Sequence, residues 1–348
     1  MFIDIKSDNY NIHFEFERRI TVIKGDSGIG KTTLVELLQD ESYDVQKETT
    51  LPVVVATTTT WQAVVRGSKS SIIIFDDMDC TETAEFSTLY KECAINNDLY
   101  FIIIGRADTE MPAMARLSYS VNSIFTIESV DNQYRQIPYY QLPEYSGECD
   151  DVLVEDTASG YTFFQKLFDG FANVYCTESG KSSVVNDTLQ LKPCKTLVIF
   201  DSAAFGCHID EFYNKVVRKR DIVVLNDYEC FEELIIRTNM FIQNSNVQLE
   251  LEKMPDSANG FLSWENYFEE LLRKTTISKQ YRFSHGAKLP HCYFEVCAKC
   301  NEYILAKCDY NDKNCSDKFV SLLKGTKYDI LVSHRRHTVY SREINSFN

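Results

Sequence analysis

Polar and apolar residues alternate regularly near the start of the chain. Residues 2–5 and 11–16 change polarity at every second position, which predicts two strands with one buried face each. Residues 19–24 form a mostly apolar segment suited to a buried strand, and residues 32–39 carry apolar side chains at helical spacing. The pattern predicts a strand, a turn and a helix, in that order.

Short apolar runs continue as far as residue 127. A continuous apolar run is typical of a parallel strand that is buried on both faces. The predicted strands cover 51–56, 71–76 and 99–104, the predicted helices 61–65 and 82–96, and a hairpin that closes the sheet 117–127.

The alternation of strands and helices starts again after residue 150. The predicted strands cover 151–155, 172–176, 195–201 and 221–225, and the predicted helices 161–168, 209–218 and 230–237. Such alternation predicts a parallel sheet with crossover helices, whose ligands bind at the carboxyl ends of the strands. A further helix is predicted over 263–274, with an apolar stripe that core packing explains.

Length and charge narrow the class of protein. The 348 residues suffice for two domains, and the net charge of −15 disfavours a broad nucleic-acid-binding surface. We expect no membrane segment and no signal peptide, because no apolar run has the required length and the first residues lack a basic region. The expected location is the cytoplasm, where the twelve cysteines are thiols or metal ligands.

The turn before the helix at 32–39 matches the pattern G-x-x-x-x-G-K-T of phosphate-binding loops, the Walker A motif. Its glycines let backbone N–H groups surround phosphate oxygens, and the helix directs its positive end at the same phosphates. Lys31 would reach the β- and γ-phosphates, and the Thr32 hydroxyl would bind Mg²⁺. The predicted nucleotide-binding residues are Gly25, Asp26, Ser27, Gly28, Ile29, Gly30, Lys31, Thr32 and Thr33. The alternative is a glycine-rich turn without a ligand.

The strand predicted at 71–76 ends in Asp76 and Asp77, which is the Walker B pattern. Asp76 would hold Mg²⁺ through water or through the loop hydroxyl. Arg106 follows the next predicted strand and would sense the γ-phosphate or pair with one of the two acids. The alternative for Arg106 is a surface arginine at a strand end.

Up to about residue 130 the sequence resembles the additional-strand class of P-loop ATPases, and the two strands before the loop resemble its ABC-type branch. The resemblance implies ATP and Mg²⁺ as ligands. It also implies that Asp77 polarises the attacking water, while Lys31 and Arg106 offset phosphate charge. Asp77 is otherwise a solvated loop acid. No L-S-G-G-Q-like signature follows, so a head-to-tail ATP sandwich of the transporter kind is not expected.

The base of the bound nucleotide is predicted by comparison with GTPases. Residues 105–108 lie where GTPases carry N-K-x-D, and Asp108 fits that pattern, but the Asn and the Lys are absent. The GTPase pattern D-x-x-G is also missing after Asp76. The sequence therefore favours adenine over guanine.

Two predicted strands of the second half end in acids, Glu155 and Asp201. This resembles the Toprim domain of topoisomerases and primases, in which a Glu after the first strand acts as acid or base and a D-x-D binds Mg²⁺. Both residues match as catalytic candidates, but Ala203 stands where the second Asp belongs. The candidates to replace it are Glu229, Glu232 and Glu233. The alternative is a Rossmann-like interaction domain whose acids face solvent.

Five cysteines lie close together near the end of the chain. Cys297 and Cys300 are separated by two residues, which lets both thiolates bind one zinc ion, and Cys308 and Cys315 would complete a site. The alternative is reduced, partly buried cysteines that pack as small apolar side chains.

The expected organisation is a P-loop NTPase domain over 1–145, a Toprim-like α/β domain over 150–245, and a helical, Cys-rich extension over 246–348 packed on the second domain. The expected function is Mg²⁺-dependent ATP hydrolysis coupled to the second domain. P-loop ATPases joined to Toprim-like domains occur in bacterial anti-phage systems, and this analogy implies defence against phage or mobile DNA. The alternative is a nucleotide-dependent switch that docks a protein partner or a second copy of the chain, without nuclease activity.

Overall fold

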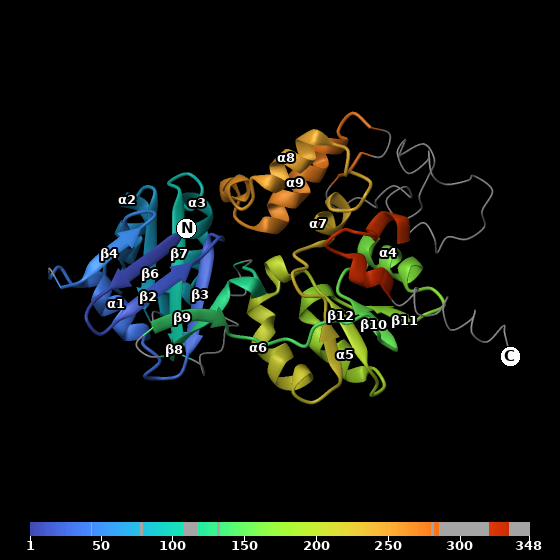
Figure 1. Cartoon of the computed structure of the whole chain (residues 1–348), viewed down its shortest axis with the longest axis horizontal. Helices are drawn as coiled ribbons and strands as arrows, with labels where there is room; N and C mark the ends of the chain where they lie inside the picture. The colour runs from blue at the N-terminus through green and yellow to red at the C-terminus, as the bar shows by residue number, and fades with distance from the viewer. Residues whose placement is uncertain are drawn as a thin grey trace. The chain divides into compact units, whose positions relative to one another are not determined.

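The computed structural model describes residues 1–42, 44–76, 79–106, 117, 119–130, 133–279, 282–284 and 320–333. The chain divides into two compact units, and each unit collects separate stretches of sequence. Unit 1 contains Met1–Gln141, Ser202–Asp210 and Pro255–Trp264, and unit 2 contains Leu142–Asp201, Glu211–Met254 and Glu265–Asn348. Both units combine a sheet with helices, so the protein is α/β (Figure 1).

Unit 1 contains a mixed sheet in the order β4-β1-β2-β9-β8-β3-β7-β6-β5. Its strands are β1 (Phe2–Lys6), β2 (Asn11–Glu15), β3 (Ile20–Gly25), β4 (Gln46–Thr49), β5 (Val53–Val55), β6 (Ser71–Asp76), β7 (Leu99–Arg106), β8 (Ile124–Val130) and β9 (Gln133–Pro138). The neighbours from β8 to β5 run parallel, whereas β1 pairs antiparallel with both β2 and β4. The strand β7 therefore lies between β3 and β6 and pairs with both.

Helices pack against both faces of this sheet. The helix α1 (Lys31–Gln39) buries Leu34 and Leu37 in the same core cluster as Ile74 and Ile102. The helix α3 (Ala84–Cys93) places the Phe86 ring against Phe75 and Phe101, whose side chains point to the opposite face because strand residues alternate. Trp61 of α2 (Trp61–Gly67) packs against Phe86. The parallel part of the sheet is thus buried on both sides.

Two predicted elements of unit 1 need correction. The helix predicted over 82–96 is shorter, because Thr83 caps its start by accepting a hydrogen bond from the Phe86 N–H at 3.1 Å. The hairpin predicted over 117–127 is instead made by β8 and β9, at 124–138. Ser120 accepts from the Asn122 N–H at 3.1 Å, and this local bond favours a 3₁₀ turn over a strand.

Unit 2 contains a parallel sheet in the order β11-β10-β12-β13, which confirms the predicted parallel arrangement. Its strands are β10 (Asp151–Val154), β11 (Asn173–Cys176), β12 (Thr196–Ile199) and β13 (Ile222–Val224). The helices described after β10 include α4 (Ser159–Leu167), α5 (Val184–Gln190), α6 (Ile209–Phe212), α7 (Phe231–Ile236), α8 (Ser245–Glu252) and α9 (Trp264–Thr276). The helix predicted over 209–218 is divided, because α6 continues as a π-helical turn at Tyr213–Val217.

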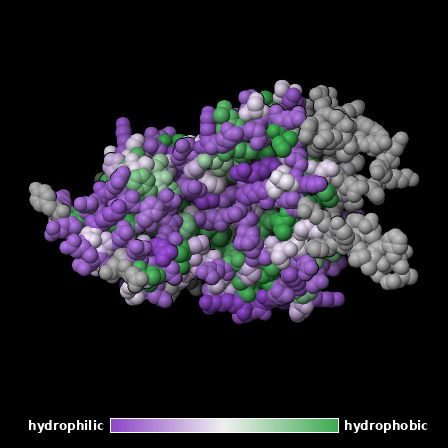
Figure 2. Space-filling model, viewed as in Figure 1, coloured by the Kyte–Doolittle hydropathy of each residue, from purple (hydrophilic) through white to green (hydrophobic). Residues whose placement is uncertain are grey.

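Hydrophilic residues cover most of the face seen in Figure 2, with smaller hydrophobic areas between them. Within the part of the chain that the structure describes, none of the helices has both the length and the apolar composition that crossing a bilayer requires.

Candidate functional site

The Gly25–Thr32 loop connects the end of β3 to the start of α1. Gly28 and Gly30 have φ angles of +89° and +99°, a region that favours glycine. The Lys31 ammonium donates to the carbonyl oxygens of Gly25 at 2.5 Å and Asp26 at 2.7 Å. The loop therefore turns back on itself with its one lysine held against its own backbone.

The loop shares one edge of the sheet with two other predicted site residues. In the register of β3 and β7, Gly25 lies opposite Arg106, and in that of β7 and β6, Ile104 lies opposite Asp76. These strands are parallel, so their carboxyl ends bring the loop, Arg106 and Asp76 to the same edge. Asp77 lies outside the described residues.

Side chains pack closely around the loop glycines. A Cβ atom on Gly25 would lie 2.2 Å from Cδ1 of Ile29 and 2.9 Å from the hydroxyl of Thr126. A Cβ atom on Gly30 would lie 3.0 Å from the ring of Tyr134 in β9. The ring of Tyr10 lies against that of Tyr134, with centroids 5.5 Å apart. A pair of partly exposed aromatic rings thus borders the loop on the side of β9.

In unit 2 the structure brings Glu155 and Asp201 together. Glu155 follows β10 and Asp201 follows β12, two neighbouring parallel strands. The Asp201 backbone N–H donates to Oε2 of Glu155 at 2.9 Å, and the hydroxyl of Thr177 donates to the Glu155 carbonyl at 2.6 Å. The two predicted acids therefore lie together at the ends of adjacent strands.

The surroundings raise the pKa of both carboxyl groups of this pair. Burial raises the pKa of Glu155, and burial together with the charge of Glu155 raises the pKa of Asp201 well above its ordinary value. Burial also raises the pKa of Glu232 to about 7, and the charges of Glu265 and Glu269 add to that shift. Unit 2 thus contains three acids with raised pKa values.

The three acids predicted as replacements for the missing aspartate are placed differently from one another. Glu232 lies within electrostatic range of Asp201. The Glu233 carboxylate instead accepts hydrogen bonds from Lys327 at 2.8 Å and Arg237 at 2.7 Å, and Glu229 is buried beside it. Among the residues that the structure describes, no three or more His, Cys, Asp or Glu side chains are arranged to hold a metal ion.

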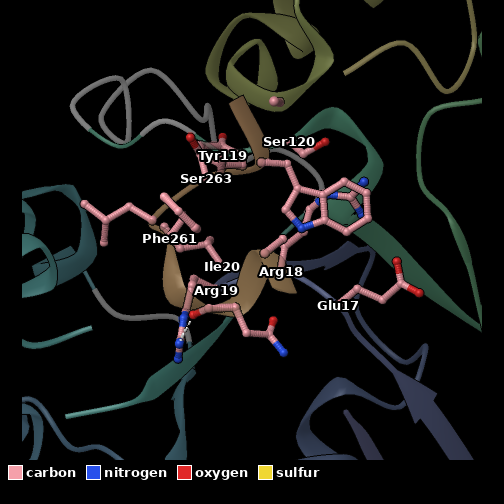
Figure 3. Close-up of a pocket in the computed structure, with 13 residues that line it drawn as sticks. Glu17, Arg18, Arg19, Ile20, Tyr119, Ser120, Phe261 and Ser263 are labelled. Atoms are coloured by element: carbon pink, nitrogen blue, oxygen red, sulfur yellow. Dashed lines mark hydrogen bonds between the residues drawn. The ribbon is translucent and has the colours of Figure 1, made fainter. Parts of the chain in front are cut away.

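A pocket in unit 1 lies where the Pro255–Trp264 segment meets the turn before β3, and Figure 3 shows Arg18, Arg19, Phe261 and Ser263 around it. It encloses about 340 Å³, part of which is open to solvent. The Arg18 guanidinium lies 3.9 Å from the centre of the Trp264 ring, and the buried Arg19 donates to Asp98 and to the Asn259 carbonyl. No residue of the Gly25–Thr32 loop lines this pocket. The two arginines hold the Pro255–Trp264 segment.

Sequence reasoning missed one cluster next to the loop. Lys24, directly before Gly25, is 1% exposed and forms an ion pair with Asp210, which also accepts a hydrogen bond from the Tyr140 hydroxyl. A lysine inside a predicted buried strand was the available signal, because a buried ammonium needs a counter-charge. The sequence alone could not indicate which acid supplies it.

Several predicted residues cannot be placed. The proposed zinc ligands Cys297, Cys300, Cys308 and Cys315 lie outside the described residues, as does Asp108.

Comparison with protein-family models, with curated proteins and with solved structures returns no match.

Proposed function

We propose that the chain binds ATP and Mg²⁺ at the Gly25–Thr32 loop and hydrolyses ATP there. The observation that carries the proposal is the position of this loop between a buried parallel strand and a helix, with glycines in positive-φ conformations and a lysine at the loop. Its backbone N–H groups and the start of α1 would receive phosphate oxygens, and Lys31 would contact the β- and γ-phosphates.

The strand order supports membership of the additional-strand class of P-loop ATPases. One strand, β7, separates the loop strand β3 from β6, which ends in Asp76. Thr32 and Asp76 would hold Mg²⁺, with Asp77 activating water and Arg106 offsetting phosphate charge. The antiparallel strands β1 and β2 before the loop are consistent with the ABC-type branch.

The aromatic rings beside the loop support a nucleotide rather than a simple phosphate ligand. Tyr134 lies against Gly30, and Tyr10 lies against Tyr134. Aromatic rings stack on purine bases, and such a contact stabilises binding by roughly 1–3 kcal/mol per base. Together with the missing guanine-reading residues, this favours ATP.

We further propose that unit 2 is a degenerate Toprim-like domain that ATP binding or hydrolysis in unit 1 controls, in defence against phage or mobile DNA. The support is the parallel sheet with Glu155 and Asp201 after adjacent strands. Ala203 departs from the Toprim pattern, and the defence role rests on analogy of architecture. Loss of nuclease activity in Glu155→Gln, measured on DNA with Mg²⁺, tests the catalytic assignment.

Lys31→Ala is the decisive variant for nucleotide binding. Removing a charge-assisted contact to phosphate should weaken the Kd for MgATP at least tenfold, by roughly 1.5–3 kcal/mol. The matched control is Lys47→Ala, because the Lys47 ammonium also donates to two backbone carbonyls, of Leu38 and Asp40, away from the loop. Equal affinities of wild type and Lys31→Ala, measured by calorimetry, would contradict the proposal.

A measurement of ATP turnover distinguishes the proposed ATPase from the alternative, a nucleotide-dependent switch. ATP hydrolysis that Asp77→Ala abolishes while binding persists would support the ATPase. Tight MgATP binding without phosphate release by the wild type would support the alternative, a nucleotide-dependent docking switch. A comparison of ATP with GTP in the same assay tests the assignment of the base.

A further inference from the structure

The buried charge of Lys24 is the starting observation. Lys24 is the last strand residue before Gly25, and its side chain points to the face of the sheet opposite α1, since Ile23 points towards α1. The side chain is only 1% exposed. Burying an ammonium group is costly unless a counter-charge and hydrogen bonds compensate.

The compensating group comes from a distant part of the sequence. Asp210 lies 186 residues after Lys24, at the end of the Ser202–Asp210 stretch of unit 1. One of its carboxylate oxygens accepts from the Lys24 ammonium and the other from the Tyr140 hydroxyl. The Tyr139 ring lies 5.5 Å from the same ammonium. Both oxygens of Asp210 are therefore engaged around Lys24.

The Ser202–Asp210 stretch is packed closely against the rest of unit 1. The Gly206 N–H donates to the Tyr119 carbonyl at 3.1 Å, and a Cβ atom on Gly206 would lie 2.5 Å from the Tyr119 ring. Phe205 and Ile209 are fully buried. These contacts hold the Asp210 carboxylate next to the end of β3.

We propose that Asp210 is a positioning residue for the phosphate-binding loop, acting through Lys24. The pair fixes the end of β3 where the loop begins, and the Gly25 carbonyl there receives the Lys31 ammonium. The consequence for nucleotide binding rests on the proposed function, but the effect on the loop does not. Because linkage is reciprocal, a nucleotide that favours this loop conformation also stabilises the docked Ser202–Asp210 stretch.

The test removes the Asp210 charge alone and then both charges together. Asp210→Asn keeps an acceptor for Tyr140 but leaves the Lys24 ammonium without its counter-charge, so β3 and the loop should loosen. Lys24→Met combined with Asp210→Asn removes both charges and should restore the loop. The matched control is Glu211→Gln, which neutralises the next residue, an acid in an exposed pair with Lys215.

Hydrogen exchange of the nucleotide-free protein gives the first readout. We expect exchange of residues 20–36 to become at least tenfold faster in Asp210→Asn, to return to within about twofold of wild type in the double variant, and to stay unchanged in Glu211→Gln. Hydrogen exchange of the α3 amides should not change. If Asp210 only stabilised the fold in general, its loss would accelerate exchange both in residues 20–36 and in α3. Unchanged exchange over residues 20–36 in Asp210→Asn, or a double variant as fast as the single one, overturns the proposal.

Nucleotide affinity gives the second readout. MgATP affinity should fall at least tenfold in Asp210→Asn and recover in the double variant. A wild type that binds no nucleotide refutes the proposed function, and the exchange data still decide the role of Asp210. If Asp210→Asn does not fold, a folded double variant with wild-type exchange supports the charge pair, and an unfolded double variant refutes it.

Discussion

Glu232 and Glu233 are neighbours in α7 whose carboxyl groups respond oppositely to their surroundings. Burial raises the pKa of Glu232 to about 7, and its acidic neighbours Glu265 and Glu269 add to this shift. Burial acts on Glu233 in the same sense, but the charges of Lys327 and Arg237 outweigh it and lower the pKa of Glu233. Glu233 is therefore a stable buried anion, whereas Glu232 destabilises the fold when it ionises.

Glu232→Gln should raise the melting temperature at pH 8 and leave it nearly unchanged near pH 4.5. The unfolded carboxyl loses its proton near pH 4.5, but the folded one retains it until about pH 7. Wild-type stability therefore falls as pH rises through this window, by on the order of 3 kcal/mol. The amide removes that loss. Thermal unfolding of Glu252→Gln, an exposed acid of α8, is the control, and a gain of equal size at both pH values would contradict this assignment.

The residues of the site differ in how far the sequence could predict them. The glycines and Lys31 follow from a contiguous motif, because a phosphate-binding turn needs these residue types in one short segment. The pairing of Glu155 with Asp201 follows from the rule that parallel strands bring their carboxyl ends together. The partner of Lys24 could not be predicted, since nothing local relates Asp210 to it across 186 residues.

At the scale of elements, the turn at Gly206–His208 shows a close approach between segments distant in sequence. A methyl group on Gly206 would collide with the ring of Tyr119 and come within 2.7 Å of its carbonyl oxygen. The ring could shift only by disturbing other buried groups, and the carbonyl belongs to backbone.

Gly206→Ala should therefore lower the free energy of unfolding by about 1–3 kcal/mol, the usual cost of overpacking a buried site. Gly67→Ala is the control, because a Cβ atom there would meet nothing within 4 Å. Denaturant unfolding of both variants measures the difference. A Gly206→Ala protein as stable as the control would mean that the Ser202–Asp210 stretch is not seated against Tyr119.

The elements with apolar signatures were predictable, and those without were not. The strands β6 and β7 contain continuous apolar runs and β3 is mostly apolar, and the burial of these strands on both faces explains why. The strand β4 has the sequence Gln-Lys-Glu-Thr and lies at the edge of its sheet, where exposed polar side chains are tolerated. The helix α5 escaped prediction because only Val184, Val185 and Thr188 are buried in it.

At the scale of the whole molecule, unit 1 needs three separate stretches of chain. Ser202–Asp210 supplies the counter-charge of Lys24, and Pro255–Trp264 supplies the Asn259 carbonyl to Arg19 and the ring that covers Arg18. The first domain predicted from the sequence, 1–145, did not include these stretches, because sequence motifs and hydrophobic periodicity indicate local structure alone.

A fragment of residues 1–141 should therefore unfold at a lower temperature and less cooperatively than a fragment of residues 1–264. The shorter fragment leaves Lys24 without the Asp210 carboxylate and Arg19 without the Asn259 carbonyl, and it exposes the surfaces that the later stretches cover. Lys24→Met should recover part of the loss, since it removes the uncompensated charge. Thermal unfolding followed by circular dichroism tests this, and equal transitions for the two fragments would refute the three-stretch organisation.

The discontinuity of unit 1 also has a consequence for synthesis on the ribosome. Translation at about 5–20 residues per second leaves roughly 6–25 s between the emergence of Gln141 and that of Trp264. For roughly the first 3–14 s of that interval, until Asp210 emerges, a nascent chain carries the completed glycine loop but lacks the acid that neutralises the lysine before it. The fraction of newly made protein that aggregates would then depend on the rate of translation and on any factor that shields the exposed surface. Codon choice between residues 142 and 264 is thus expected to affect yield more than codon choice after residue 264.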